Sequence, residues 1–434
     1  MRAHALRPLA LLLSTAACAV PRVPGTPQPS GAPPTCCLAE GLRIAERHRA
    51  GAIDSRRFTH ETLWRAIEPS LREGAFRVEE IGRSVQGREI RAVTWGGGPT
   101  TVLLWSQMHG DESTATMALA DIFGWLAAGA SDPLRDRLGR ALAITFVPML
   151  NPDGAELFQR ENALGIDVNR DARRLTTPEG RALKSIRDRI RPDYGFNLHD
   201  QSARIAAGPG GDQVAIALLA PAFDEARGWN PVRSDARLVA ASIAAMLEQE
   251  IPGRIAKYDD AFNPRAFGDL MQQWGTRTVL VESGAIAGDP EKQRLRAINV
   301  AIILTALDAI ATGRARAVDA GHYERLPFNE RIVTDVLIAF GTLVLDGQRY
   351  PLDLAFTWED PLGRSGALRL REVGDLTGAV ALDTIDATGL FLHLEPSMLT
   401  ARGGGRWLRL GAVAALTLRH GEGTQSEAVR RIGF

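Results

Sequence analysis

Two histidines and two glutamates occupy positions that could assemble a metal-dependent hydrolytic site. His109 and Glu112 are three residues apart, His199 follows ninety residues after His109, and Glu282 lies further along the chain. Where a strand turns into a helix, a spacing of three lets an imidazole and a carboxylate face one point. With a second imidazole the set becomes His, Glu, His, and a catalytic zinc site needs three protein ligands and an open fourth position for water. The sequence therefore predicts a zinc site, provided that the fold brings these side chains together.

Apolar runs that are expected to form buried strands deliver three of these residues. Such a run ends just before each of His109, His199 and Glu282. The expected strands are 90–95, 101–105, 141–149, 194–198, 214–219 and 278–281, the expected helices are 59–71, 113–128, 178–190, 235–250 and 289–311, and a turn is expected at 151–154. Because ligand sites of open α/β sheets lie at the carboxyl ends of strands, the three residues could converge.

The order of these elements predicts the fold class. Strands alternate with helices, which indicates an α/β fold with a mixed, mostly parallel central sheet and helices on both faces. Later in the chain, short alternating segments separated by Gly and Asp predict a small C-terminal all-β domain. The predicted domains are a leader at 1–19, a Pro-rich linker at 20–40, an α/β catalytic domain at 41–318 and a β-rich accessory domain at 325–434.

The first residues are typical of an export signal. Two arginines precede the apolar run 9–13, and small residues follow it. The run is too short to span a bilayer. Two endings remain open, because 17–19 fits a cleavage site, whereas 14–18 is similar to a bacterial lipobox that would place a lipid anchor on Cys18. We therefore expect an exported protein, either periplasmic or lipid-anchored in the bacterial envelope.

Charge and cysteine content limit the possible binding partners and metal ligands. Lys and Arg together number 51, as do Asp and Glu, so the formal net charge is zero. No broad basic face for nucleic acid is indicated. The three cysteines are Cys18, Cys36 and Cys37. A metal site in the body of the protein must therefore use nitrogen and oxygen ligands.

A series of short segments resembles, in order, the motifs of the zinc carboxypeptidases of the carboxypeptidase A type. The segments are 81–90, 109–112, 151–154, 165–170, 198–199 and 281–284. The resemblance covers roughly residues 55 to 312. It implies the zinc carboxypeptidase-like α/β fold, one Zn²⁺ ion and a peptide or amide substrate with a free carboxylate.

The resemblance also implies a role for each polar residue of the site. His109, Glu112 and His199 would bind Zn²⁺, which lowers the pKa of a bound water to about 7 and polarises a scissile carbonyl. Glu282 would take a proton from that water and pass it to the leaving amine. Arg160 would stabilise the oxyanion of the tetrahedral state.

Three further residues would complete the site. Asn169 and Arg170 are similar to the pair that grips a terminal carboxylate, a task that suits the planar fork of arginine. Asp167 is expected to accept a hydrogen bond from the second nitrogen of His109 and so to fix its tautomer.

Two positions depart from the family pattern. A tyrosine expected about twenty residues before the catalytic glutamate is missing from 260–263, and Tyr258 is only close to that place. Gly268 falls where the pocket for the substrate side chain has its base, which predicts a roomy, uncharged floor.

The sequence thus predicts an exported zinc-dependent carboxypeptidase. A first alternative is a zinc amidase of the same fold that acts on cell-wall stem peptides or N-acyl amino acids. A second is a non-catalytic binding protein with a vestigial site, which the presence of all three ligands and Glu282 argues against.

Overall fold

A computed structural model describes residues 38–331 and 333–433, which belong to one compact unit. The predicted leader, including Cys18, lies outside these residues. Within the described part, no helix is both long enough and apolar enough to cross a membrane.

An eight-stranded sheet organises the first three hundred residues. Its strands run in the order β1-β2-β4-β3-β5-β9-β7-β8. The strands are β1 (Phe76–Arg83), β2 (Glu89–Gly96), β3 (Thr100–Ser106), β4 (Leu142–Val147), β5 (Tyr194–Asp200), β7 (Ile216–Leu219), β8 (Ile255–Lys257) and β9 (Arg277–Ser283). The four central strands β4, β3, β5 and β9 are mutually parallel, whereas β1, β2 and β7 bring antiparallel pairs. The predicted mixed sheet with a parallel centre is confirmed.

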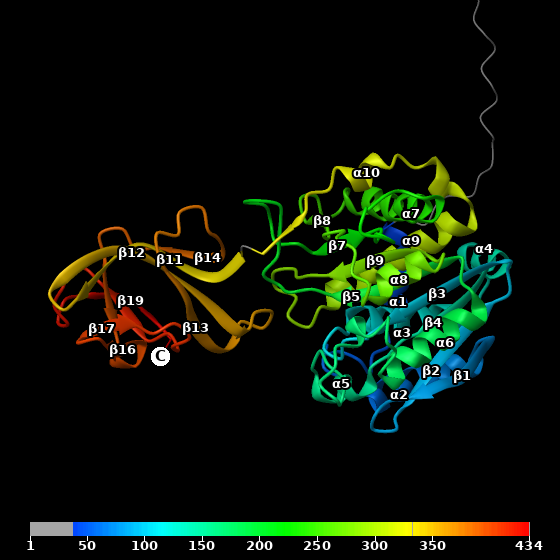
Figure 1. The fold of residues 1–434 in the computed structure, drawn as a ribbon, viewed down its shortest axis with the longest axis horizontal. Helices are drawn as coiled ribbons and strands as arrows, with labels where there is room; N and C mark the ends of the chain where they lie inside the picture. Colours follow the sequence, from blue (N-terminus) through cyan, green and yellow to red (C-terminus); the bar gives the residue numbers. More distant parts are fainter. Residues whose placement is uncertain (1–37, 332, 434) are drawn as a thin grey trace, which may run out of the picture. The chain divides into compact units, whose positions relative to one another are not determined.

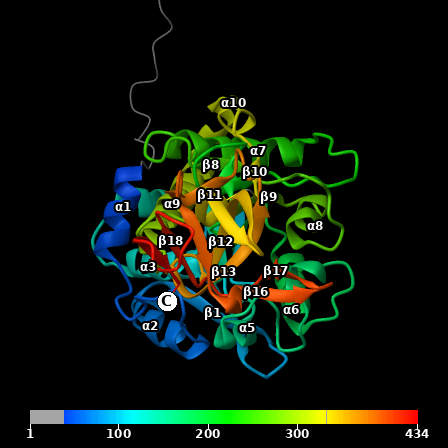
Figure 2. The same ribbon diagram turned by 90° about the vertical axis from the view of Figure 1, so that its left-hand side faces the viewer.

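Helices cover both faces of this sheet (Figure 1). One face packs against α1 (Leu38–Arg47), α2 (His60–Glu73), α3 (Thr114–Ala127), α4 (Pro133–Ala141), α7 (Pro231–Leu247) and α9 (Gln293–Ala311). The other face packs against α6 (Pro178–Ile190) and α8 (Phe267–Gln273). In Figure 2, α1 and α3 lie to the left of the sheet, and α6 and α8 lie to the right.

Alternation along β3 shows how one strand supplies both cores. Val102 and Leu104 pack on the α3 and α9 side, whereas Leu103 and Trp105 pack on the α6 and α8 side. All four side chains are fully buried. This is why 101–105 reads as a continuous apolar run instead of an alternating one.

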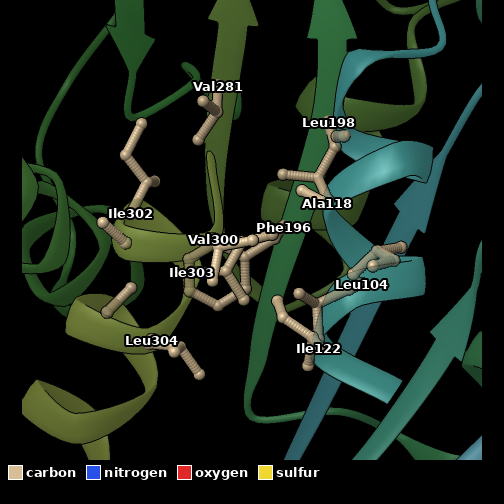
Figure 3. Close-up of a cluster of buried hydrophobic side chains, with 14 of the residues drawn as sticks. Leu104, Ala118, Ile122, Phe196, Leu198, Val281, Val300, Ile302, Ile303 and Leu304 are labelled. Atoms are coloured by element: carbon tan, nitrogen blue, oxygen red, sulfur yellow. The ribbon is translucent and has the colours of Figure 1, made fainter. Parts of the chain in front are cut away.

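The larger core lies between the central strands and two helices (Figure 3). Leu104, Phe196 and Val281 come from β3, β5 and β9, and they meet Ile122 of α3 and Val300 of α9. Burying each such side chain contributes about 1.5–3 kcal/mol. This core fixes the three strands that carry the candidate site.

Several predicted elements need correction. The turn predicted at 151–154 is instead the start of a short helix, α5 (Pro152–Leu157). Asn151 caps it by accepting a hydrogen bond from the Gly154 amide at 2.9 Å, so the Asn and Pro are helix-start signals. The helix predicted from 289 begins only at Gln293, so Pro290 precedes the helix and is not in its first turn. Helix α4, which leads into β4, was not predicted.

The C-terminal part is rich in strands, as predicted. Its main sheet contains β11 (Val333–Leu345), β12 (Gln348–Asp360), β13 (Ser365–Gly374), β14 (Val380–Asp386), β15 (Phe391–Leu394), β18 (Leu416–Arg419) and β19 (Ala428–Ile432). A second sheet pairs β16 (Leu399–Arg402) with β17 (Gly405–Leu408). The remaining short elements are β6 (Ala206–Ala207), which pairs with β10 (Asn329–Glu330), α10 (Gly321–Glu324), η1 (Val168–Arg170), η2 (Arg314–Ala317) and η3 (Pro396–Met398). The predicted domain boundaries remain predictions.

Candidate metal centre and active site

The loop between β3 and α3 presents the first two candidate ligands. Gln107 turns the chain with a positive φ of 49°. Gly110 packs so closely on the Gly154 backbone that a Cβ atom would lie 2.0 Å from its carbonyl carbon. Only glycine fits there, and the contact presses the loop that carries His109 and Glu112 against α5.

The structure brings together the three residues predicted to bind zinc. The Nδ1 atom of His109 lies 2.7 Å from Glu112 Oε1, and the Nδ1 atom of His199 lies 2.6 Å from Glu112 Oε2. The candidate ligand atoms of all three residues lie within 4.8 Å of one another, and all three residues are buried. Two imidazole nitrogens and a carboxylate, turned toward one point, form a donor set that suits Zn²⁺.

Asp167 settles which nitrogen of His109 faces that point. Its Oδ1 atom lies 3.0 Å from His109 Nε2. An ionised carboxylate can only accept a hydrogen bond, so Nε2 carries the proton. The lone pair of a neutral His109 is then on Nδ1, beside the carboxylate of Glu112. Two such acceptors side by side fit a cation between them, which is the observation that supports a metal here.

Neighbouring charges shift the pKa values of the candidate ligands His109 and Glu112. Burial disfavours the charged form of His109, but Glu112 and Asp167 outweigh burial and raise its pKa to about 9. Burial would likewise raise the pKa of Glu112, yet His109 and His199 hold it well below its usual range. The negative charge of this site therefore attracts a proton, which a bound cation would displace.

Arg160 contacts both Asp167 and the candidate ligand Glu112. Its guanidinium donates to Asp167 Oδ2 at 2.9 Å and to Glu112 Oε1 at 3.1 Å. Both carboxylates raise its pKa, although burial acts the other way. It is therefore a fixed positive charge next to the point that the candidate ligands face.

Asn169 and Arg170 follow Asp167 in a single 3₁₀ turn. Asp167 caps this turn by accepting a hydrogen bond from the Asn169 amide at 2.8 Å. The Asn169 side chain accepts from the Phe267 amide at 2.8 Å, and its Nδ2 atom lies 3.4 Å from His199 Nε2. Arg170 is exposed, and its Nη1 atom donates to the Asn169 carbonyl at 2.8 Å.

Glu282 lies beside the candidate ligands on the neighbouring strand. It pairs in register with His199 across β5 and β9. Its Oε2 atom is buried and has no hydrogen-bond partner among the described residues. Burial, reinforced by Glu112 and Asp200, raises its pKa well above the usual range. A carboxylate in this state is a strong base for its type.

One cavity of about 530 Å³ contains these groups. Seven of the eight predicted site residues line it: His109, Glu112, Arg160, Asn169, Arg170, His199 and Glu282. Asp167 is not among the lining residues, and it contacts the Nε2 atom of His109. The sequence-based roles of all eight remain predictions.

Sequence reasoning missed parts of this cavity. Tyr258 lines it although 260–263 holds no tyrosine, and both burial and Glu282 raise its pKa. Gly268 lines the cavity as expected, and Asp269 beside it adds a carboxyl group to the lining. Burial raises the pKa of Asp269 to about 6.

Lys292 is a further residue that the sequence did not reveal. Its Nζ atom donates to Asp200 Oδ2 at 3.0 Å and to the Ser283 carbonyl at 3.1 Å. Thr114 donates to the same Asp200 oxygen at 2.7 Å. This buried pair holds the ends of β5 and β9 together. No local signal marks Lys292, since it stands in an ordinary charged turn.

Residues 70–249 match the zinc carboxypeptidase family, peptidase family M14. Over this segment the chain is similar to a zinc carboxypeptidase domain. Members of this family depend on zinc, and the His-Glu-His group described above fits that requirement.

Known proteins are similar to parts of this chain. Carboxypeptidase 2 of Trichophyton tonsurans is 31% identical over 116 residues, which cover 26% of this chain and 21% of the relative. A probable carboxypeptidase 2 of Trichophyton verrucosum is 30% identical over 186 residues, or 42% of this chain and 34% of the relative. The chain thus spans about a fifth to a third of the length of these curated relatives. The structure of a metallo-carboxypeptidase from Burkholderia cenocepacia is 21% identical, covers 58% of this chain and 70% of that chain, and has a TM-score of 0.45.

Proposed function

We propose that this protein is an exported zinc-dependent carboxypeptidase that hydrolyses the peptide bond next to a free C-terminal carboxylate. The observation that carries the proposal is the position of Glu282. A buried carboxylate with raised pKa and no hydrogen-bond partner in the described structure stands in register with a candidate zinc ligand. Such a group has no evident structural task and is placed for proton transfer.

His109, Glu112 and His199 would hold one Zn²⁺ ion. When bound, the ion supplies an acidic water and polarises the scissile carbonyl. The residues of the chain do the rest. Glu282 takes the proton of the water and hands it to the leaving amine. Arg160 faces the negative charge that develops on the carbonyl oxygen.

Arg170 and Asn169 would orient the substrate. Arg170 is exposed in the cavity wall, so its guanidinium is accessible to a terminal carboxylate. A bidentate arginine–carboxylate pair would fix the C-terminal residue and place the preceding peptide bond over the candidate zinc ligands. Asp167 keeps His109 in the required tautomer.

The place of action follows from the leader predicted at 1–19. We propose that the protein is periplasmic, or anchored in the bacterial envelope by a lipid on Cys18. Labelling of cells with a clickable fatty acid, compared between the natural protein and Cys18→Ala, separates the two. Label that depends on Cys18 indicates the anchor, and its absence indicates the periplasmic form.

Digestion of a mixed peptide library by the zinc-loaded protein tests the activity. Each peptide is supplied with a free and an amidated C-terminus, Glu282→Gln is the blank, and mass spectrometry follows the products. Stepwise loss of single residues from free C-termini alone is the expected result. No cleavage above the blank would contradict the proposal. Cell-wall stem peptides and N-acyl amino acids would then test for an amidase of the same fold.

A further inference from the structure

Two residues of the turn between β12 and β13, which spans residues 361–364, line the same cavity as the candidate catalytic residues. Pro361 and Leu362 both belong to the cavity lining together with Glu282. The turn lies far outside the segment 70–249 that matches the zinc carboxypeptidase family. The C-terminal strand-rich part therefore contributes to the wall of the cavity.

An ion pair anchors the turn. Arg56 donates to Asp360 Oδ2 at 2.5 Å, with the two side chains 12% and 22% exposed. Asp360 also shapes the turn, because its Oδ1 atom accepts from the Leu362 amide at 3.2 Å and from the Gly363 amide at 3.4 Å. Although burial acts against it, Arg56 keeps the pKa of Asp360 below its usual value. One carboxylate thus both folds the turn and fastens it.

Arg56 is itself held firmly and connects the turn with one side of the cavity. Its carbonyl accepts from Ser113 Oγ at 2.6 Å, and its amide donates to Glu291 Oε2 at 2.9 Å. Its guanidinium lies 5.5 Å from the ring centre of Phe158. Phe158 stands two residues before Arg160, and all three side chains line the cavity. The contacts of the turn therefore lead to the Arg160 side of the cavity.

A second anchor fastens β12, one of the two strands that carry the turn. Arg204, five residues after His199, donates to Asp335 Oδ2 at 2.7 and 3.0 Å and to the Trp358 carbonyl at 2.5 Å. The Asp335 side chain is only 1% exposed. Its Oδ2 atom also accepts from the Trp358 amide at 2.7 Å, two residues before Asp360. Anchors at both places hold β12 in a fixed position beside the cavity.

We propose that the turn 361–364 is a specificity element that closes the Arg160 side of the cavity and limits the length of the substrate. This inference rests on the proposed function. In that function Arg160 faces the scissile carbonyl, and Arg170 binds the terminal carboxylate. A wall on the Arg160 side then meets the residues that precede the scissile bond. The preferred substrates would be short peptides with a free carboxylate, and long chains would be excluded. Pro361 suits such a wall because its fixed φ makes the turn stiff.

Kinetics with two peptides that share their last two residues test the proposal. One is an N-acetylated dipeptide and the other is a longer peptide of about ten residues, both used with the full-length, zinc-loaded protein. In Asp360→Ala, the kcat/KM ratio of long to short peptide should rise about tenfold or more, while the dipeptide value stays within about twofold. Leu362→Gly, which keeps the ion pair and removes a side chain from the cavity, should shift the ratio in the same direction.

Asp386→Ala is the matched control. Asp386 caps another turn of the C-terminal part by accepting from the Thr388 amide and hydroxyl at 2.9 and 2.6 Å. It is not among the cavity-lining residues, so its loss should leave the ratio unchanged. A ratio that stays at the natural value in both Asp360→Ala and Leu362→Gly overturns the proposal.

A binding measurement separates this inference from the proposed function. If the natural protein cleaves neither peptide, the proposed activity is wrong, and the wall is judged by affinity alone. Zinc-loaded Glu282→Gln is then titrated with both peptides, with and without Asp360→Ala. Binding of the long peptide that strengthens about tenfold without Asp360 supports the wall, and unchanged binding of the long peptide overturns it.

Discussion

His199 and Glu282 are register partners on the parallel neighbours β5 and β9. Partners on adjacent parallel strands point to the same side of the sheet, so the candidate ligand and the candidate base face one cavity. The next pair, Asp200 and Ser283, is fastened by Lys292 through hydrogen bonds of 3.0 and 3.1 Å. The distance between base and ligand is therefore set by the backbone of the sheet.

Glu282→Gln should abolish turnover and keep the metal. The change removes the proton acceptor but none of the three candidate ligands, so kcat should fall by roughly 10²–10⁴-fold. Zinc content by mass spectrometry should stay that of the natural protein. Glu179→Gln is the control, since Glu179 is also buried but does not line the cavity. Loss of zinc from Glu282→Gln would show that Glu282 is a ligand and not the base.

His199→Ala should lose the metal. It removes one of three protein ligands from a zinc site, so zinc content should drop from about one ion per chain to near zero after dialysis. His60→Ala is the control, because His60 is half-buried and its Nε2 atom lies 2.9 Å from the Glu89 carbonyl, away from the cavity. A His199→Ala protein that retains full zinc would contradict the ligand assignment.

Arg170→Ala should weaken binding of substrates that have a free C-terminal carboxylate. A hydrogen bond to a charged group is worth about 1.5–3 kcal/mol, so KM for such substrates should rise roughly tenfold to a hundredfold. Amidated analogues should be affected far less. Arg173→Ala removes an exposed arginine that does not line the cavity and is the control. An equal rise in KM for free and amidated substrates would contradict the role of Arg170 in binding the terminal carboxylate.

The sequence predicts the central sheet well because each central strand carries its own signal. A strand buried on both faces is a continuous apolar run, and such runs mark β3 and β9 closely. Local composition was misleading at 151–154, where Asn and Pro start a helix but are also common in turns. In the C-terminal part, where the sequence predicts short segments, β11 is a single strand of 13 residues. Phe340 has a positive φ of 61°, and the pairing with β12 shifts between Ile338 and Gly341, so the strand passes through an irregularity that the sequence shows as a break.

Only those site residues that lie close together in the sequence could be predicted to act together. His109 and Glu112 share a loop, and three residues of spacing suffice to predict that they act together. Lys292 and Arg56 reach the cavity only through tertiary contacts with Asp200 and Asp360. Such contacts join residues that are far apart along the chain and leave no mark in either local sequence.

Breaking a buried ion pair distant from the cavity should strongly destabilise the α/β part. Arg296 donates to Asp121 Oδ2 at 2.7 Å, and both side chains are 1% exposed. Asp121→Ala would leave the guanidinium buried without its counter-charge, so the free energy of unfolding should fall by about 3–5 kcal/mol. Arg325→Ala, which breaks the exposed pair with Asp319, should lower the free energy of unfolding far less. Denaturant unfolding measures both, and equal losses would contradict the burial argument.

Tyr323 should make stability depend on pH in the alkaline range. Its hydroxyl accepts a hydrogen bond from the Ala220 amide at 3.2 Å, and burial raises its pKa to about 12. In the unfolded chain a tyrosine has a pKa of about 10. Between these values the unfolded chain releases the proton and the folded protein does not. The contribution is therefore fully present below pH 10 and is lost as the pH rises toward 12, by about 2–3 kcal/mol.

Comparing the stability of Tyr323→Phe with that of the natural protein at several pH values tests this prediction. At pH 8 the variant should be less stable than the natural protein by about 1 kcal/mol, because the Ala220 amide loses its acceptor. Since phenylalanine does not titrate, this deficit should shrink above pH 10 and reverse by about pH 12. Tyr350→Phe, at an exposed position, should show no such reversal. Urea unfolding of the three proteins at pH 8, 10, 11 and 12 tests the prediction, and a stability difference for Tyr323→Phe that stays constant with pH would contradict it.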